Sequence, residues 1–364
     1  MSENRSASLL FQPIRLGDLD LRNRIAMAPL TRSRALKGDV PRPSAVEYYS
    51  QRASAGLIIT EATQVDDSAK GYAFTPGVYT DAQVASWKNV TDAVHAKGGS
   101  IVVQIWHVGR ISHPSLQPQG VKPVGPSAVK PEGNAFTESG FQPHEEPRAL
   151  EVDEIRQIVA DFAHAATMAR KAGFDGVEVH AAHGYLIDQF LRDGSNKRHD
   201  QYGGSIENRT RFLFEVMGAV SDAIGGGRTG VRLSPVSPVN DSSDSNPVPL
   251  YLHAVEGLNR FNPAYLHIVE GATGGSRDYV PGYDFGALKK AFHGKYMGNN
   301  GYDFALADAA LREGRADVIA MGRPFISNPD LVERLKSGAP IAPSDPNTYY
   351  GGDEHGYTDY PSLG

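Results

Sequence analysis

One structural unit repeats along this sequence, and it constrains the fold more than any other feature. Each copy has an acidic residue that caps a helix, apolar residues at helical spacing, one or two cations, a glycine and a β-branched strand. Copies begin at Asp81, Asp153 and Asp303. A glycine after a cationic last turn suits a helix C-terminus, because it adopts positive φ at low cost and the cations complement the helix dipole. The pattern therefore predicts helices that alternate with strands.

Strands are predicted at eight places, which are residues 24–29, 57–63, 100–106, 176–181, 229–234, 265–270, 295–299 and 318–322. Helical patterns lie between most of them. Alternating strands and helices imply a parallel sheet with right-handed crossovers. Eight such units predict an α/β protein with a closed (β/α)8 TIM barrel, a fold of about 250 residues before insertions. An open, doubly wound sheet is the alternative.

The chain has 364 residues, and three segments account for the additional length. Residues 10–22, with a turn at Gly17-Asp18, predict a β-hairpin that closes the bottom of the barrel as a lid. Residues 114–147 form a Pro/Gly-rich excursion, and residues 340–364 form a Tyr/Gly-rich tail, so we expect extended loops at the top. No stretch resembles a linker, which predicts one domain over residues 1–364.

The composition excludes several classes of protein. The chain has no cysteine, so it forms no disulfide, thiolate nucleophile, cysteine-ligated zinc site or iron–sulfur cluster. A net charge of −6 gives no electrostatic reason to expect nucleic acid or a membrane as partner. No apolar run approaches the ~20 residues of a membrane span, and no signal peptide is evident. We therefore expect a cytoplasmic protein.

Chemistry in such barrels collects at the C-terminal ends of the strands. The predicted strand ends carry Thr31, Glu61, Ala62, Gln104, Trp106, His180, His183, Arg232, Glu270, Asn299, Asn300, Gly322 and Arg323. If the Gln104 amide, the Trp106 indole and the Arg232 cation face one cavity, they suit a flat heteroaromatic ligand better than a metal. The alternative for Arg232 is a buried ion pair with an aspartate. The alternative for Gln104 is an amide that forms hydrogen bonds to neighbouring strands.

The fourth predicted strand ends in a group of residues that suggests acid catalysis. His180 lies on the strand face opposite to its apolar neighbours, and His183 and Tyr185 follow in the turn. Two imidazoles can bind one substrate oxygen, while a phenol with a pKa of ~10 stays protonated at neutral pH and can act as an acid. The group indicates a reductase or isomerase site. The alternative is a pair of buried histidines with ordinary partners and a core tyrosine.

The ends of the last two strands indicate a phosphate site. Residues 298–301 read Gly-Asn-Asn-Gly, and residues 321–323 read Met-Gly-Arg. Barrels commonly bind phosphate at this position, where glycine amides approach the anion and a basic side chain covers it.

Two other motifs point to functions that we do not expect. Residues 225–230 match G-x-G-x-x-G, but they precede a predicted strand, whereas a dinucleotide-binding motif follows one. His180 and His183 are spaced like half of a zinc site, yet no third ligand is evident, so we expect no metal.

The sequence resembles the old yellow enzyme family of FMN-dependent ene-reductases over nearly its whole length, and within it the bacterial pentaerythritol tetranitrate and N-ethylmaleimide reductases. The motifs that carry the resemblance lie at residues 23–32, 48–59, 61–63, 104–107, 176–185, 200–209, 322–326 and 356–361. One subgroup of the family has cysteine at the position of Thr31, and this chain resembles the threonine type.

The resemblance implies an oxidoreductase that holds FMN noncovalently and uses NADPH or NADH as reductant. Its partners would be small electrophilic alkenes or nitro compounds: α,β-unsaturated carbonyls, maleimides, nitroalkenes and, by extension, nitrate esters. It also implies ping-pong turnover with hydride transfer from flavin N5, in a monomer or weak homodimer. A phosphate-binding barrel lyase or isomerase without flavin is the alternative function.

The resemblance also assigns roles to residues. Thr31 would bond the flavin carbonyl O4, Gln104 would contact the pyrimidine side, and Arg232 would lie near N1 and O2. The full set of implied cofactor-binding residues is Pro29, Thr31, Ala62, Gln104, Arg232, Asn300, Gly301, Gly322 and Arg323. The implied substrate-binding residues are Thr31, Tyr72, Trp106, His180, His183, Tyr185 and Tyr350. Among these, His180 and His183 would bind the substrate oxygen, and Tyr185 would donate the proton.

Overall fold

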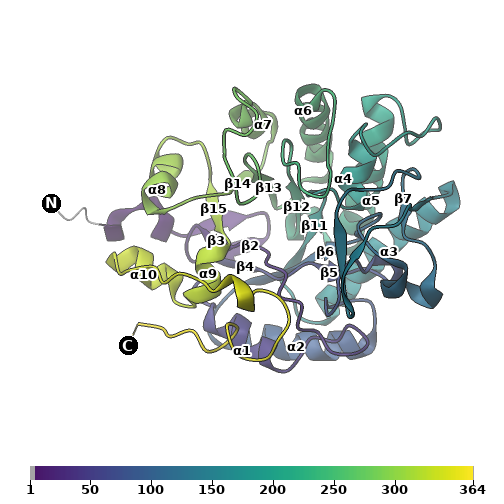
Figure 1. Ribbon diagram of the computed structural model, residues 1–364. Coiled ribbons are helices and arrows are strands. Elements are labelled where there is room, and N and C mark those ends of the chain that lie inside the picture. The colour runs from purple at the N-terminus through teal and green to yellow at the C-terminus, as the bar shows by residue number, and fades with distance from the viewer. Residues whose placement is uncertain (1–4, 364) are drawn as a thin grey trace.

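The computed structural model describes residues 5–363 and has at its centre a closed barrel of eight parallel strands (Figure 1). The barrel strands are β3 (Ile25–Met27), β4 (Leu57–Ile59), β6 (Ile101–Trp106), β11 (Gly176–His180), β12 (Thr229–Leu233), β13 (Tyr265–Val269), β14 (Lys295–Asn299) and β15 (Val318–Met321). Each lies within a predicted strand. The barrel closes where β11 pairs with β6, with Val177 opposite Val103. The predicted TIM barrel is therefore confirmed, and the open sheet is wrong.

Helices surround the barrel, as Figure 1 shows. They are α1 (Ser44–Gln51), α2 (Asp81–Ala96), α3 (Val152–Lys171), α4 (Leu186–Leu191), α5 (Ile206–Ile224), α6 (Pro247–Leu258), α7 (Phe285–Ala291), α8 (Phe304–Arg312), α9 (Arg323–Ser327) and α10 (Leu331–Ser337). The glycines expected after the helices adopt positive φ, as Gly173 does after α3 with a φ of 88°. In the described part of the chain, no helix is both long and apolar enough to cross a bilayer.

Of the three predicted acidic caps, only one is correct. Asp303 caps α8 with its side chain. The cap of α2 is Thr80, whose hydroxyl accepts from the Gln83 amide while the Gln83 side chain accepts from the Thr80 amide. This reciprocal pair satisfies two free amide groups at the start of the helix. Asp81 and Asp153 lie instead in the first turns of α2 and α3, where a negative charge is still favourable.

The predicted hairpin closes the N-terminal end of the barrel. Strands β1 (Ile14–Leu16) and β2 (Leu19–Leu21) pair antiparallel, and their leucines pack onto residues inside the barrel. The Asp18 amide donates to the Gly227 carbonyl oxygen at 2.8 Å. The glycine-rich run 225–230 therefore lies beside the hairpin, at the end of the barrel opposite to the strand C-termini.

Two extended segments lie over the other end of the barrel, as expected. The excursion contains a second hairpin of β8 (Asn134–Thr137) and β9 (Gly140–Pro143). The carbonyl of Phe136 in β8 accepts from the amide of Ala73, which follows Tyr72. The C-terminal segment is held by arginine side chains, since Arg32 donates to backbone carbonyls of residues 348, 349 and 356.

Candidate active site

A cavity of about 580 Å³ lies at the C-terminal ends of the barrel strands. It collects almost every predicted site residue, namely Pro29, Thr31, Ala62, Gln104, Trp106, His180, His183, Tyr185, Arg232, Asn300, Gly301, Gly322, Arg323 and Tyr350. Of the residues with an expected cofactor or substrate role, only Tyr72 is not part of the cavity lining, and the strand-end residues Glu61 and Glu270 do not line it either. A parallel barrel brings these residues together because all its strands end on the same rim.

Arg232 carries a buried positive charge into this cavity. It extends from β12, opposite His180 on β11, and is 5% exposed. Its Nη2 donates to Asn299 Oδ1 at 2.8 Å, while its Nε has no partner among the described residues. The predicted alternative of an arginine–aspartate pair is therefore wrong, because the partner is a neutral amide. The guanidinium retains the capacity to bind a negatively charged ligand atom.

The orientation of the Gln104 amide is fixed by a neighbouring strand. Its Nε2 donates to Glu178 Oε1 at 2.7 Å, and Glu178 Oε2 contacts His267 Nδ1 at 2.8 Å. Burial alone would raise the pKa of Glu178, but His267 and Arg232 hold it below its ordinary value. A carboxylate can only accept, so the amide nitrogen must point to it. The amide oxygen of Gln104 remains available to an N–H group of a ligand.

Trp106 organises the aromatic side of the cavity. Its ring lies nearly parallel to that of His180, at an interplanar angle of 15° and a centroid distance of 6.0 Å. Tyr185 packs edge-on against it at 4.7 Å. Offset and edge-to-face contacts of this kind restrict the rotamers of the rings.

Tyr72 contacts Tyr185. The two hydroxyls are 2.9 Å apart, and either can be the donor. Burial raises the pKa of Tyr185 well above its ordinary value and that of Tyr72 to about 12. Both phenols are therefore protonated at neutral pH. The role of Tyr72 as a substrate contact stays a prediction, whereas its contact with Tyr185 is present in the structure.

The two histidines lie side by side, with ring centroids 5.5 Å apart. Burial lowers the pKa of each well below 6.5, with smaller contributions from neighbouring positive groups such as Arg232. Both imidazoles are therefore neutral at pH 7. They are buried and have hydrogen-bond partners, as the alternative interpretation held, yet both also line the cavity.

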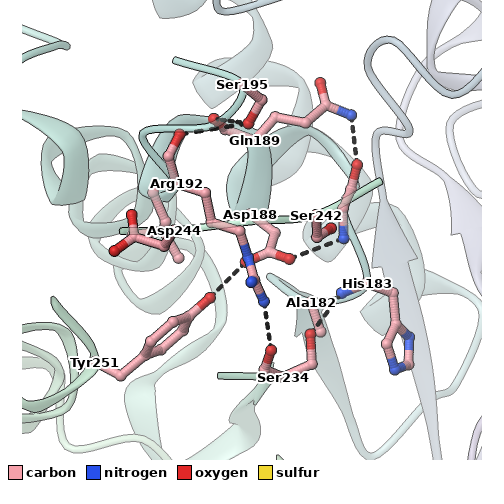
Figure 2. Close-up of polar contacts among 12 residues, drawn as sticks. Ala182, His183, Asp188, Gln189, Arg192, Ser195, Ser234, Ser242, Asp244 and Tyr251 are labelled. Carbon is pink, nitrogen blue, oxygen red and sulfur yellow. Dashed lines mark hydrogen bonds and ion pairs between the residues drawn. The ribbon is translucent and has the colours of Figure 1, made fainter. Parts of the chain in front are cut away.

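A buried ion pair supports the turn that presents His183, as Figure 2 shows. His183 adopts a left-handed backbone conformation with a φ of 60°, which is uncommon for a residue with a side chain. Its amide donates to Ser234 Oγ at 2.8 Å, and the next amide donates to Asp188 Oδ2 at 2.8 Å. Asp188 Oδ1 pairs with Arg192 Nε at 2.9 Å, and Arg192 also donates to the Ser234 carbonyl. The network links both sides of the turn.

We expect Asp188→Ala to lower the free energy of unfolding by about 3–5 kcal/mol, because it leaves the Arg192 charge buried without its partner. Urea denaturation measures this value. Asp92→Ala is the matched control, since Asp92 forms an exposed i,i+4 pair with Lys88. It should cost less than about 1 kcal/mol. Equal effects of the two substitutions would contradict a structural role for the buried pair.

The side chain of Asn300 is fully used within the protein. Its Nδ2 donates to the carbonyls of Glu270 and Ala272, at 2.8 and 2.9 Å, and its Oδ1 accepts from the Gly274 amide at 3.1 Å. These bonds fix the loop that follows β13. At the predicted phosphate site, only the backbone of Asn300 remains available to an anion.

Arg323 is the free cation at the same end of the cavity. It is exposed, and its side chain makes no hydrogen bond or ion pair with any residue between 5 and 363. Its guanidinium lies beside Gly274, where a Cβ atom would come within 2.7 Å of Nη2. Gly301 and Gly322 line the cavity nearby. Glycine backbone and an arginine side chain of this kind suit a phosphate group.

Sequence reasoning missed several lining residues, which include Thr273, Gly274, Gly275, Tyr302 and Tyr349. The first three follow β13, and Glu270 was the residue that the sequence analysis named at the end of this strand. That residue does not line the cavity but accepts from the hydroxyls of Tyr296 and Tyr302, at 2.9 and 2.7 Å. The glycine pair after Thr273 was a signal that could have directed attention to the loop.

The groups left unpaired in the cavity fit FMN. Gln104 Oε1 and Arg232 Nε match the N–H and the electron-rich edge of a flavin ring, while Arg323 and the glycines match its phosphate. The fold and this site define a class of protein, the barrel oxidoreductases that bind a flavin nucleotide.

Comparisons with known proteins identify the family. A model of the NADH:flavin oxidoreductase / NADH oxidase family matches residues 9–341. A probable flavin mononucleotide-dependent alkene reductase of Leishmania infantum is 43% identical over 99% of each chain. The structure of morphinone reductase in complex with tetrahydroNAD is 49% identical over 98% of each chain, with a TM-score of 0.93. An old yellow enzyme homologue from Zymomonas mobilis is 45% identical over 97% of this chain and 99% of its own, with a TM-score of 0.94.

The chain belongs to the NADH:flavin oxidoreductase / NADH oxidase family and is an oxidoreductase of the old yellow enzyme type. The family implies FMN as cofactor and a nicotinamide as reductant. The resemblance stated from the motifs is thereby confirmed at the level of the family.

Proposed function

We propose that this protein uses NADPH or NADH to reduce activated C=C bonds of small molecules such as enones, maleimides and nitroalkenes. The observation that carries the proposal is the placement of His180, His183 and Tyr185 in the cavity that also contains Gln104 and Arg232. Two neutral hydrogen-bond donors and a neutral acid therefore lie next to a site that fits a flavin.

FMN, when bound, supplies the hydride that the alkene accepts. Gln104, Arg232 and Thr31 would hold its ring, together with Pro29 and Ala62. The backbone of Asn300, Gly301 and Gly322, together with Arg323, would hold its phosphate.

The histidines would bind the oxygen of the electron-withdrawing group. That oxygen gains negative charge as the β-carbon is reduced, so hydrogen bonds to it stabilise the transition state more than the ground state. Neutral imidazoles suit this role because each has one N–H to donate. Tyr185 would then donate its proton to the α-carbon.

The nicotinamide and the alkene would use the cavity in turn. Once FMN is bound, a cavity of about 580 Å³ leaves little room for two further molecules at once. We therefore expect ping-pong kinetics with parallel double-reciprocal lines. Intersecting lines without substrate inhibition would contradict a shared site.

The purified protein tests the function directly. It should be yellow and release FMN on denaturation, NADPH or NADH should bleach it, and 2-cyclohexenone should restore its colour. Recovery of FAD alone or of no flavin would overturn the cofactor assignment. A bleached protein whose colour no enone or nitroalkene restores would overturn the reaction.

We expect Arg323→Ala to raise the dissociation constant of FMN about 10- to 100-fold, because a charge-assisted contact to the phosphate is lost. Fluorescence titration of the apoprotein measures this constant. Arg312→Ala, which removes an exposed cation on α8, should leave it unchanged. Riboflavin lacks the phosphate, so Arg323→Ala should leave its affinity unchanged. An equal loss for both flavins would contradict phosphate binding by Arg323.

A further inference from the structure

The two cavity histidines can both donate only if each carries its proton on the correct nitrogen. A neutral imidazole has one donor and one acceptor nitrogen, and the hydrogen bond at one nitrogen determines what the other can do. The partners that each ring has inside the protein therefore decide what it offers to a ligand.

A backbone amide sets the tautomer of His180. The Ala182 N–H donates to His180 Nδ1 at 3.3 Å, so this nitrogen accepts. The proton must then lie on Nε2, which has no partner among the described residues. His180 therefore offers an Nε2–H donor.

A hydroxyl, which can either donate or accept, meets the ring of His183. Thr273 Oγ1 lies 2.8 Å from His183 Nε2, and Nδ1 has no partner within residues 5–363. If the hydroxyl donates, Nε2 accepts and Nδ1 carries the proton. If it accepts, the proton lies on Nε2 and Nδ1 offers only a lone pair. The direction of this one hydrogen bond therefore decides whether His183 can donate to a substrate.

Ser237 favours the first of these directions. It is fully buried, and its Oγ lies 2.9 Å from Thr273 Oγ1 and accepts from the Thr273 amide. A buried hydroxyl must donate its hydrogen somewhere, and Thr273 Oγ1 is its only acceptor among the described residues. Thr273 Oγ1 therefore accepts from Ser237, and among the described residues the acceptor left for its own hydrogen is His183 Nε2.

The loop that carries Thr273 is anchored on both sides. Asn300 bonds the carbonyl of Ala272 and the amide of Gly274, the two residues that flank Thr273. The hydroxyl is therefore held in position, although the loop lies at the exposed rim of the cavity.

We propose that Thr273 is a positioning residue, oriented by Ser237, that holds His183 as the Nδ1–H tautomer. His180 and His183 then present opposite ring nitrogens, Nε2–H and Nδ1–H, to one oxygen. The proposal concerns which nitrogen of the His183 ring carries the proton, and its effect on turnover rests on the proposed function. Without the hydroxyl, the Nε2–H tautomer becomes accessible and places a lone pair where a donor is needed.

Nitrogen-15 NMR of histidine-labelled, FMN-loaded protein tests the tautomer without any substrate. His183→Asn identifies the His183 signals by their loss. Wild type should show a protonated Nδ1 and an unprotonated Nε2 at His183. Thr273→Val should shift the proton toward Nε2, and Thr273→Ser should retain the wild-type pattern. An unchanged tautomer in Thr273→Val, or an Nε2–H tautomer in wild type, would overturn the proposal.

Kinetics test the consequence for catalysis. Thr273→Val should slow enone reduction about 10-fold while the affinity for FMN stays unchanged, and Thr273→Ser should restore the rate. An asparagine at position 183 donates from an amide that has no tautomer. In the His183→Asn protein, Thr273→Val should therefore cause no further loss. A further loss of similar size there would show that Thr273 acts by packing and would overturn the proposal.

The NMR experiment and the kinetic experiment test different claims, so one claim can fail while the other stands. If removing both histidines left enone reduction intact, the proposed role of the histidines would fail, but the tautomer assignment would stand. If only the NMR result were contrary, the tautomer assignment would fail and the proposed function would stand.

Discussion

Replacing His180 and His183 together by alanine is expected to slow the reduction of 2-cyclohexenone about 10³-fold or more. Removing one preorganised donor to a developing oxyanion typically costs 10²–10³-fold in rate, and this variant removes two. The binding of FMN should survive, because neither side chain lies at the Arg232 or Arg323 contacts. Stopped-flow absorbance follows reoxidation of the reduced enzyme by the enone and measures the effect.

The matched control for this variant is His95→Ala, which removes a partly exposed histidine of α2 that pairs with Asp175 far from the cavity lining. Its enone kinetics should equal those of wild type. Unchanged kinetics in a folded, FMN-loaded double variant would remove the histidines from the mechanism.

Tyr185→Phe is expected to slow enone reduction by about 10²-fold or more, within the usual range for a lost general acid. The phenyl ring keeps the edge contact with Trp106, so the substitution removes only the hydroxyl and its bond to Tyr72. Reduction by NADPH should proceed normally, because it needs no proton from this residue. Stopped-flow measurement of the two half-reactions separates these effects.

Two comparisons sharpen the test of Tyr185. Nitroalkenes should suffer less from Tyr185→Phe, since a nitronate product can leave before its carbon is protonated. Tyr72→Phe removes the partner hydroxyl but keeps the acid, so it should cost far less than Tyr185→Phe. Equal enone rates in wild type and Tyr185→Phe would point to water or another side chain as the proton source.

The barrel could be predicted from the sequence because its signals are local. Helical periodicity, a glycine such as Gly173 at a helix end and a β-branched run are each set by neighbouring residues, and repetition strengthens them. Helix caps were less predictable. Thr80 and Asp81 are adjacent, and the choice between them depended on whether the Gln83 side chain could reach back to complete a reciprocal pair.

Most of the cavity lining could also be predicted, because parallel strands of a barrel end on one rim. Strand-end residues such as Gln104, His180 and Arg232 must then lie close together, whatever their separation in the sequence. The resemblance to the old yellow enzyme family extended the prediction to residues such as Tyr350. The precise roles of these residues stay predictions that the variants above can test.

The sequence by itself thus determined the eight strands, their order of alternation with helices and many of the residues at the rim. Only the tertiary structure decided how these residues pair: Arg232 with Asn299, Asn300 with the loop after β13, and His183 with Thr273, which is 90 positions away in the chain. The physical reason is that hydrogen bonds act over about 3 Å and require defined angles. Such contacts depend on barrel closure, strand register and loop position, which no short stretch of sequence encodes.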